Sequence, residues 1–564
     1  MCIRDRLVRE GSLPLELAQK ITEEVENRIY KYQTAYLTGS LIRELVNSVL
    51  LEHGYEEYRH KLARVGLPAF EVQETISNAE NLDSGIESLL FNTGQTVFAE
   101  YLLTNTLPKD IADSHLSGDL HITRPGLWSL LPDSIFINIK ELIEDGIDLK
   151  GKALSVSKLT SIKTLSNLSS ALSMIISLIA KEASQEVIMD GLVSLLSKYS
   201  KNLSELEEKL VNSFIMSSTA FKFNKTPTIV SFTLPLGVEQ KIVNVVLSAY
   251  KTYVGLTPRP RIGLVINYEK GKITDVSNII AEIISLGGEI IFAKHSISQN
   301  GVTRLKSTGS STLHLGSLSI NLPRLAFESN KDETYFRARL ALLMKPALTS
   351  MSLRKKNISE LVRLGMNPIL ANNTQYMQRC STSLVINLVG LRDAVFGILG
   401  FNDDKQGCEV LHKVVETSVD IALKKAKELG TDVLVTMTKS DGSGRFISLD
   451  EEKYGKNSIL KITENETYAE GVVIDASTLA DLTIKSPQIV QCNRMAKTLN
   501  GGLFTQVKIP NGSKITEIKK NIEKISSLTN SFKLIMRVPL CGNCGMKDQT
   551  LSDKCPSCKS SYII

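Results

Sequence analysis

Short apolar runs rich in β-branched residues alternate with amphipathic segments over the second half of the chain, and this alternation most restricts the possible folds. The segments between the runs have helical periodicity, for example at 274–286, 333–347 and 407–429. Strands that are apolar on both faces and separated by helices are typical of parallel sheets covered by helices. The pattern after Pro227 predicts a mainly parallel α/β sheet or barrel built from the runs TIVSFTLPL, RIGLVINYE, EIIFAK, LSINLPRLAF, SLVINLVGL, DVLVTMTKS, GVVIDAS, LFTQVKIP and FKLIMRVP.

The part of the chain before Pro227 is mostly helical in pattern. Within the first 65 residues the spacing of apolar residues predicts two amphipathic helices, one at 12–32 and one after residues 38–40 with a break at Gly54. Two such helices bury too little surface for an independent core. The unit formed by these two helices therefore either lacks its strands or obtains them from another part of the protein.

Composition limits the class of protein. A length of 564 residues indicates one large barrel with appendages, or several domains. The net charge of +6 is small for this length and no Lys/Arg block dominates, so nucleic-acid binding is not indicated. There is no apolar run of about 18 residues and no secretory signal, so we expect no membrane contact. Outside the C-terminal region the cysteines are scattered, which predicts a reducing, cytoplasmic location: Cys2, Cys380, Cys408 and Cys492.

The C-terminal region concentrates the other four cysteines. Cys541-x2-Cys544 is followed after ten residues by Cys555-x2-Cys558. Two such knuckles complete a tetrahedral thiolate cage for zinc, and a closed cage of this kind is structural rather than catalytic. The alternatives are two chance pairs or a redox dithiol, but a short polar tail without a core of its own favours zinc.

Several stretches resemble one family, the anaerobic (class III, glycyl-radical) ribonucleoside-triphosphate reductases, and they follow in that family's order. They are SHLSGDLHI (114–122), GSLSINLPRLAFES (316–329), TSLVINLVGLRDAVFGILGF (382–401), SGRFISLDEEKYG (443–455), LNGGLFTQVKI (499–509) and the four-cysteine end. The resemblance implies an α/β fold: a ten-stranded α/β barrel of the glycyl-radical reductase type with a finger loop inside. It also implies three domains: a partial ATP-cone unit of helices at 1–65, the reductase barrel at 66–535 and a zinc-ribbon tail at 536–564.

The resemblance further implies an enzyme that makes deoxyribonucleoside triphosphates from ribonucleoside triphosphates by radical chemistry, for DNA synthesis. In such proteins a glycyl radical is relayed to a cysteine thiol, whose weak S–H bond allows reversible hydrogen transfer. The implied partners are ATP and dATP as allosteric effectors, a radical S-adenosylmethionine activase with an iron–sulfur cluster, and a second copy in a homodimer.

The sequence departs from the family at three places. The finger loop, expected at 295–317, contains no cysteine. No Arg-x-x-Gly-Tyr-like radical motif follows the four cysteines, and the strands that open the family's ATP-cone are absent before 12–32. We expect the chain to be truncated at both ends; the other account is a protein that truly lacks the radical glycine. The alternative function is then a catalytically inactive relative that binds nucleotides or regulates.

A few further residues are candidates for the site. Cys380 is the best candidate for a catalytic thiol that lies outside the finger loop. The alternative is that Cys380 is a small buried apolar residue. Asn321 and Arg324 lie at a strand end, where α/β barrels often bind substrate; for Arg324 the alternative is a structural ion pair. His115, His121 and Asp119 are interpreted as a local hydrogen-bonding set rather than a metal cluster. The glycine-rich segment 439–446 is a weak phosphate-binding signal, and Asn387, polar within an apolar strand, needs a buried partner.

Overall fold

The computed structural model describes most of the chain. The described residues are 3–9, 11–32, 39–62, 66, 69–77, 85–144, 147–148, 158–159, 162, 164–199, 201–219, 229–269, 273–294, 297–298, 301–302, 312–367, 369–370, 381–399, 405–463, 466–548, 551 and 553–563.

The first half of the sheet contains five neighbouring strands that all run in the same direction. They are β2 (Ser134–Asn138), β5 (Glu186–Asp190), β6 (Ile229–Pro235), β7 (Ile262–Asn267) and β8 (Glu289–Ala293). Buried residues fill nearly every position of these strands, so both faces of the sheet are covered, as the continuous apolar runs predict.

The second half is again parallel, and it meets the first half antiparallel at both edges, where β11 pairs with β2 and β17 pairs with β8. Its strands are β11 (Thr312–Asn321), β12 (Ser381–Val389), β13 (Asp432–Met437), β15 (Gly502–Leu503), β16 (Thr505–Lys508) and β17 (Ser531–Ile535). Every run named after Pro227 therefore contains a strand, and the run GVVIDAS contains β14 (Val472–Asp475). In LSINLPRLAF only the first part is strand, because the chain turns into helix α14 (Leu322–Glu328) after Asn321.

The sheet curves into a nearly closed barrel because one segment, 502–508, joins its two ends. Phe504 donates its N–H to Met437 O of β13 and accepts at its carbonyl from Val472 N of β14, both at 3.0 Å. The following residues of the same segment pair with β17. The strand path has twelve members where ten were predicted, because β15 and β16 are two parts of one segment and β14 is an additional strand beside it.

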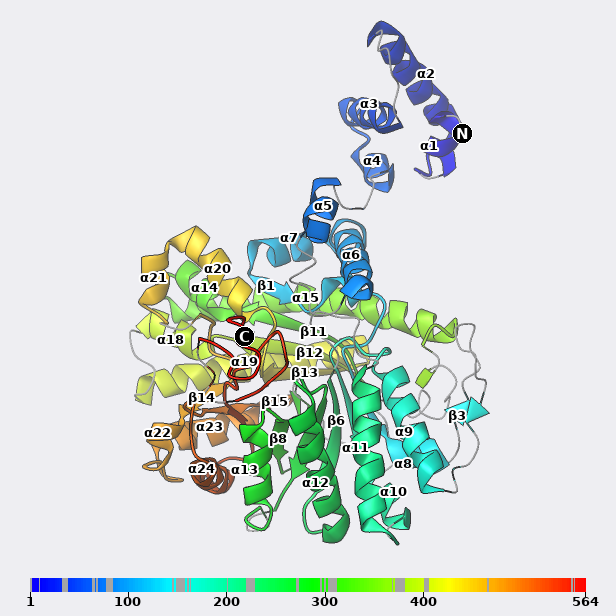
Figure 1. Ribbon diagram of the computed structural model, residues 1–564. Helices are drawn as coiled ribbons and strands as arrows, with labels where there is room; N and C mark the ends of the chain where they lie inside the picture. Colours follow the sequence, from blue (N-terminus) through cyan, green and yellow to red (C-terminus); the bar gives the residue numbers. More distant parts are fainter. Residues whose placement is uncertain are drawn as a thin grey trace.

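Helices surround the outer face of the barrel, and the main hydrophobic core lies between them and the strands (Figure 1). The predicted helices at 274–286, 333–347 and 407–429 are present as α13 (Ser277–Ser285), α15 (Glu333–Arg363) and α19 (Lys405–Leu429). The other helices after residue 138 are α8 (Ile139–Glu144), α9 (Leu165–Ile179), α10 (Leu192–Leu196), α11 (Leu203–Thr219), α12 (Gln240–Leu256), α14 (Leu322–Glu328), α18 (Leu391–Leu399), α20 (Ser443–Tyr454), α21 (Lys456–Leu460), α22 (Ala476–Leu479), α23 (Pro487–Thr498) and α24 (Ile515–Leu528).

The N-terminal helices have a small hydrophobic cluster of their own, separate from the main core. Figure 1 shows them beyond α5, at a distance from the barrel. They are α1 (Ile3–Arg9), α2 (Leu15–Tyr32), α3 (Gly39–Glu52) and α4 (Glu56–Leu62). The chain then continues through α5 (Ala69–Ser77), α6 (Gly85–Tyr101), α7 (Lys109–Ser117) and β1 (Leu120–Ile122), which pairs antiparallel with β11. Within the part of the chain that the structure describes, no helix is long and apolar enough to cross a membrane.

Candidate functional site

A polar cavity of about 540 Å³ lies at one end of the barrel. Because the two halves of the barrel are antiparallel, the starts of β5 to β8 share this end with the carboxyl ends of β11 to β13. Both halves contribute side chains to the lining, and three cations and three carboxylates are among them: Arg124, Glu186, Arg261, Glu289, Lys439 and Asp441.

An apolar layer closes the barrel interior beyond the cavity. Side chains in a strand alternate between faces, so positions two apart share the interior. Along β5 the side chain that faces the interior is first the charged Glu186 and then the apolar Ile188. Along β8 it is first Glu289 and then Ile291. Together with Phe136, Val265, Ala293 and Phe504, these apolar residues form one buried cluster. The cavity is therefore a pocket with a floor rather than a channel.

Arg124 supplies a cation to the cavity from an unusual backbone position. Its φ is +45°, in the left-handed region that a residue with a side chain rarely adopts. Its buried Nη1 has no hydrogen-bond acceptor among the described residues, and burial lowers the pKa of Arg124 although Asp441 and Asp133 oppose the shift. A guanidinium held in this way is suited to an anionic ligand.

Glu289 is an ionised carboxylate at the edge of the cavity. Burial alone would raise its pKa, but the ammonium of Lys533, 2.5 Å away, and that of Lys439 lower it overall. Glu289 and Lys439 also line an adjoining space of about 420 Å³ that extends to Lys533 and Gln506. The site thus continues from the barrel mouth toward β16 and β17.

The glycine-rich segment 439–446 forms part of the cavity wall. Asn387 fixes its start, because the side-chain amide donates to Thr438 O (3.1 Å) and accepts from Thr438 N (2.9 Å). Gly442 is required by a close approach: a Cβ there would lie 2.4 Å from Cγ of His121. Asn387 therefore holds the loop and also lines the cavity, so the buried partner that it needed is the loop backbone.

The two histidines near β1 have separate partners. His115 accepts at Nδ1 from Ile122 N (3.2 Å), and burial lowers its pKa to about 3, so its ring is neutral. His121 Nε2 lies 3.1 Å from Asp441, not beside Asp119. Among the described residues these side chains do not form a group that could hold a metal ion. They also do not form the predicted set with Asp119, which lies 3.5 Å from Nη1 of Arg324 instead.

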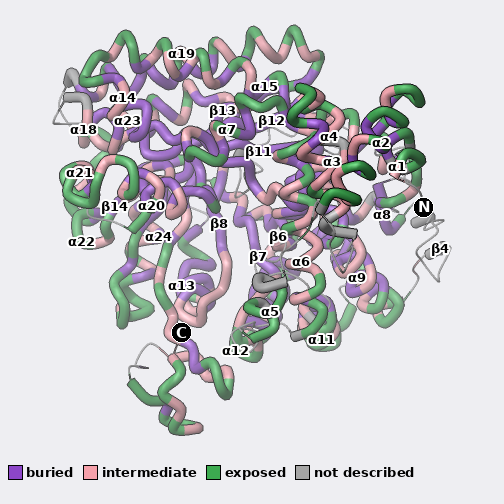
Figure 2. Tube along the Cα trace, turned by 90° about the horizontal axis from the view of Figure 1, so that it is seen from above, coloured by how far each residue is buried: buried purple, intermediate pink, exposed green. Residues whose placement is uncertain are grey.

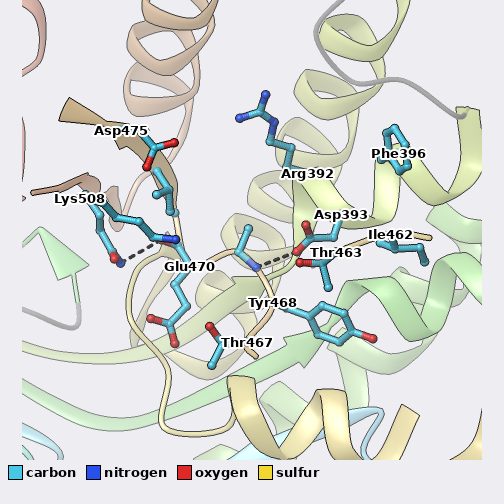
Figure 3. Close-up of a pocket in the computed structure, with 14 residues that line it drawn as sticks. Arg392, Asp393, Phe396, Ile462, Thr463, Thr467, Tyr468, Glu470, Asp475 and Lys508 are labelled. Carbon is cyan, nitrogen blue, oxygen red and sulfur yellow. Dashed lines mark hydrogen bonds between the residues drawn. The ribbon is translucent and has the colours of Figure 1, made fainter. Parts of the chain in front are cut away.

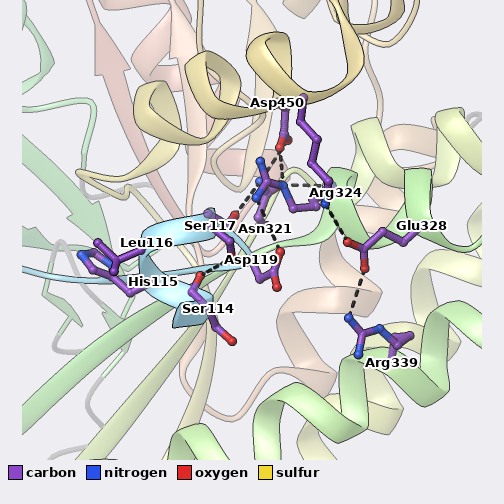
Figure 4. Close-up of polar contacts among 12 residues, drawn as sticks. Ser114, His115, Leu116, Ser117, Asp119, Asn321, Arg324, Glu328, Arg339 and Asp450 are labelled. Carbon is purple, nitrogen blue, oxygen red and sulfur yellow. Dashed lines mark hydrogen bonds and ion pairs between the residues drawn. The ribbon is translucent and has the colours of Figure 1, made fainter. Parts of the chain in front are cut away.

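Asn321 and Arg324 lie in a buried polar network beside the cavity (Figure 4). Arg324 is 1% exposed and contacts Asp450 through Nε at 2.5 Å, with Asp119 3.5 Å from its Nη1. Asn321 caps α14 by accepting from Arg324 N and donates to Gly118 O and Asp450. Tyr468 also donates to Asp450, at 2.9 Å. Neither Asn321 nor Arg324 is among the residues that line the cavity described above.

None of the described residues that line the cavity is a cysteine. Cys380 lies outside the described residues, as does most of the finger loop at 295–317. Cys492 lies in the main core, 3.3 Å from Thr505 Oγ1, and burial raises the pKa of its thiol to about 11. Cys408 is half-buried on α19, outside the barrel. The two described cysteines outside the C-terminal region thus occupy packing positions.

The four C-terminal cysteines converge as predicted. Their sulfur atoms all lie within 4.8 Å of one another, with Cys541–Cys558 and Cys544–Cys555 at 3.5 Å. Sulfurs at the corners of a tetrahedron around zinc, each about 2.3 Å from the ion, are about 3.8 Å apart. The donor set and its spacing therefore fit a closed four-thiolate zinc site.

A further space of about 500 Å³ lies outside the barrel mouth, between α18 and the loop before β14 (Figure 3). Asp393 and Glu470 line it, but both are engaged: Asp393 accepts from Ala469 N, and Glu470 accepts from Ser440 N and Ser443 Oγ. Figure 3 shows Arg392 pointing away from these carboxylates. The charged side chains that line this space do not point toward a common centre. The barrel cavity is therefore the better candidate for the functional site.

Four charged residues of the cavity were not predicted from the sequence: Arg124, Glu186, Arg261 and Glu289. Lys439 and Asp441, by contrast, lie in the segment 439–446 that was identified as a weak phosphate-binding signal. Glu186 and Glu289 each occupy the first position of an apolar strand, and Arg261 directly precedes β7. The sequence signal that could have identified these residues is a charged residue at the first position of a buried strand. It identifies a site only once the strands are placed side by side.

Comparison with known proteins assigns the fold and the family. The structure resembles the anaerobic ribonucleotide reductase from Thermotoga maritima with dATP bound in the specificity site, with a TM-score of 0.64 and 15% identity over 94% of this chain and 97% of that one. The same enzyme in complex with dATP and CTP gives a TM-score of 0.65 at 16% identity, covering 94% of this chain and 96% of that one. The B12-independent glycerol dehydratase from Clostridium butyricum gives 0.51 at 11% identity, over 90% and 89%. No curated protein sequence matches the chain.

The barrel and its internal cavity thus define a protein with the fold of the glycyl-radical enzymes. The family description "Anaerobic ribonucleoside-triphosphate reductase" matches residues 272–563, which is more than half of the chain. The chain belongs to the anaerobic ribonucleoside-triphosphate reductase family.

Proposed function

We propose that this chain binds a ribonucleoside triphosphate in the barrel cavity and reduces it to the deoxyribonucleoside triphosphate by radical chemistry, for DNA synthesis. The observation that carries the proposal is the cavity itself, which has a volume suited to a small ligand and brings Arg124, Arg261 and Lys439 to one polar space. Guanidinium and ammonium groups are suited to donate hydrogen bonds to the oxygens of a triphosphate. The carboxylates of Glu186 and Glu289 provide acceptors for ribose hydroxyl groups.

The proposed reaction removes the 2′ hydroxyl of the ribose as water and takes two electrons from an external reductant, and it needs a thiol near the ribose to abstract the 3′ hydrogen. We keep Cys380 as the candidate, since the finger loop at 295–317 contains no cysteine. The glycyl radical, when present, supplies the hydrogen-abstracting equivalent, and a radical S-adenosylmethionine activase with an iron–sulfur cluster is the proposed partner that generates it. The protein's own contribution is to orient the ribose and, through the apolar floor of the cavity, to exclude water from the reacting groups.

We propose roles for the regions on either side of the barrel as well. The N-terminal helices, with their separate cluster, are assigned to part of an ATP-cone that binds ATP or dATP as effectors. The four C-terminal cysteines are assigned to a structural zinc ion. Asn321 and Arg324, predicted as substrate-side residues, are proposed to act on the cavity indirectly, through the buried network with Asp450. A homodimer is the proposed assembly.

A second function is a catalytically inactive relative that binds nucleotides for regulation. One observation favours it: none of the described residues lining the cavity is a cysteine. The two functions share the nucleotide and differ only in the thiol and in what the bound nucleotide becomes.

The test separates binding from turnover. Equilibrium dialysis with CTP is expected to give saturable binding that is weakened in Arg261→Ala. Anaerobic incubation with a radical S-adenosylmethionine activase and a reductant, followed by chromatography of the nucleotides, then measures dCTP. Because no radical motif follows the four cysteines here, turnover is measured on the full-length gene product. Binding with dCTP formation that Cys380→Ala abolishes supports the reductase. Binding without dCTP in a full-length product that carries a radical glycine supports the regulatory relative, and the absence of CTP binding would overturn both.

A further inference from the structure

A half-buried lysine fastens the four-cysteine segment to the barrel. Lys547 Nζ donates to Val254 O (2.6 Å), Thr257 O (2.8 Å) and Leu286 O (2.9 Å). Three carbonyl acceptors use all three donors of an ammonium group. Burial lowers the pKa of Lys547 to about 8, so at neutral pH it keeps its proton.

The three carbonyls belong to the ends of two helices. Val254 is in the last turn of α12 and Thr257 directly follows it, while Leu286 directly follows α13. The last carbonyls of a helix have no partner within the helix, and the helix dipole favours a cation there. Lys547 therefore caps α12 and α13 together, and Figure 2 shows the C-terminal segment beside these helices.

The first cysteine knuckle holds Lys547 in place. Lys547 pairs with Leu540 in an antiparallel bridge, Cys541 N donates to Met546 O at 2.8 Å, and Gly545 N donates to Cys541 O at 2.9 Å. Gly545 is also close to the barrel, because a Cβ there would lie 2.7 Å from Pro258 Cγ. A metal ion on the thiolates would fix this hairpin and hence the lysine.

The loops that Lys547 caps also line the cavity. After α12 the chain reaches Pro260 and Arg261, and after α13 it reaches Glu289. Tyr250 of α12 ties these two strand starts together, since its hydroxyl donates to Ile262 O (2.8 Å) and accepts from Glu289 N (3.1 Å). A shift of either helix end would therefore displace a charged group of the cavity.

From this chain of contacts we propose that Lys547 is a positioning residue that couples the four-cysteine site to the nucleotide cavity. The metal-bound knuckle holds Lys547, Lys547 holds the ends of α12 and α13, and these ends hold Arg261 and Glu289 at the cavity edge. The affinity for a ribonucleoside triphosphate then depends on metal occupancy. The identity of the ligand in this inference rests on the proposed function. The mechanical coupling between the four-cysteine site and the cavity does not.

The experiment compares the full chain with Lys547→Met and with Lys524→Met, whose lysine donates to a single carbonyl, that of Ala480, at the surface. Zinc content, hydrogen–deuterium exchange of 257–263 and 286–290, and the dissociation constant for CTP are measured for each. We expect Lys547→Met to keep its zinc, to exchange faster in both segments and to bind CTP about tenfold more weakly. Lys524→Met is expected to match the wild type, and Lys547→Arg, which keeps charge and donors, to recover part of the affinity.

Zinc removal completes the test. A chelator is expected to reproduce the Lys547→Met exchange pattern in the wild type and to add nothing in that variant. Unchanged exchange in Lys547→Met, or an equal effect in Lys524→Met, would overturn the coupling. If Lys547→Met loses zinc, Lys547→Gln takes its place in the same comparison. Failure of the wild type to bind CTP would refute the proposed function alone, because exchange still decides the coupling.

Discussion

The buried pair Arg324–Asp450 offers the sharpest test of how this barrel is held together. Both side chains are at most 1% exposed, and Asp450 accepts from Arg324 Nε (2.5 Å), Asn321 Nδ2 (3.0 Å) and Tyr468 Oη (2.9 Å). The network joins the turn before β1, the end of β11 and helix α20. The change to make is Arg324→Met, which keeps much of the side-chain volume and removes the charge.

The expected cost follows from the burial of the remaining carboxylate. Breaking a buried pair by removing one partner costs about 3–5 kcal/mol, because it leaves an uncompensated charge. Burial raises the pKa of Asp450, so the carboxylate can take up a proton once Arg324 is absent. We therefore expect the lower end, about 3 kcal/mol. The double variant Arg324→Met with Asp450→Leu is expected to lose less than the single one, because no unpaired charge remains.

Urea unfolding followed by Trp128 fluorescence is a suitable assay, since this only tryptophan is 2% exposed in the barrel body. The control is Arg339→Met, which removes the more exposed pair with Glu328 (3.2 Å) and should cost less than about 1 kcal/mol. A loss below about 1 kcal/mol in Arg324→Met, together with weaker CTP binding, would refute the reasoning. Arg324 would then be a substrate-side residue rather than a structural one.

Three other predictions follow from single residues. Metal analysis should find about one zinc per chain in the wild type and much less in Cys541→Ser; an unchanged content would exclude the four-thiolate site. Burial lowers the pKa of His314 from 6.5 to about 4. The folded protein therefore loses stability as the pH falls from 6.5 toward 4, by about 2 kcal/mol at pH 5. Between pH 7.5 and pH 5, the urea midpoint of His314→Leu should fall less than that of the wild type. Gly442→Ala should weaken CTP binding, because its methyl group would displace His121 or the loop, whereas Gly455→Ala, with nothing within 4 Å, should affect only local backbone strain.

Several features were predictable because they depend on local pattern. Every apolar run after Pro227 contains a strand, and the amphipathic segments between the runs form helices, because residue spacing reflects whether an element is buried on two faces or on one. The convergence of Cys541, Cys544, Cys555 and Cys558 was also predictable, because two CxxC knuckles in a short tail have few ways to bury their thiols.

The cavity was not predictable in the same way. Arg124, Glu186, Arg261, Glu289 and Lys439 are far apart in the sequence and become neighbours only when the barrel closes. Closure depends on segment 502–508 bonding to β13, β14 and β17 at once, and on the two halves meeting antiparallel. Strand order and register are set by long-range packing, which no local spacing records.

The sequence by itself thus determined the α/β character of the chain, the strands after Pro227 and the four-cysteine site, because these follow from periodicity and from ligand spacing, whereas β2 and β5 lie in the part predicted to be mostly helical. The tertiary structure alone decided which charges share the cavity, which partners Asn321 and Arg324 have, and that Lys547 fastens the tail to α12 and α13. Each of these depends on groups from separate elements meeting within a few ångströms, and only the closed barrel brings those elements together.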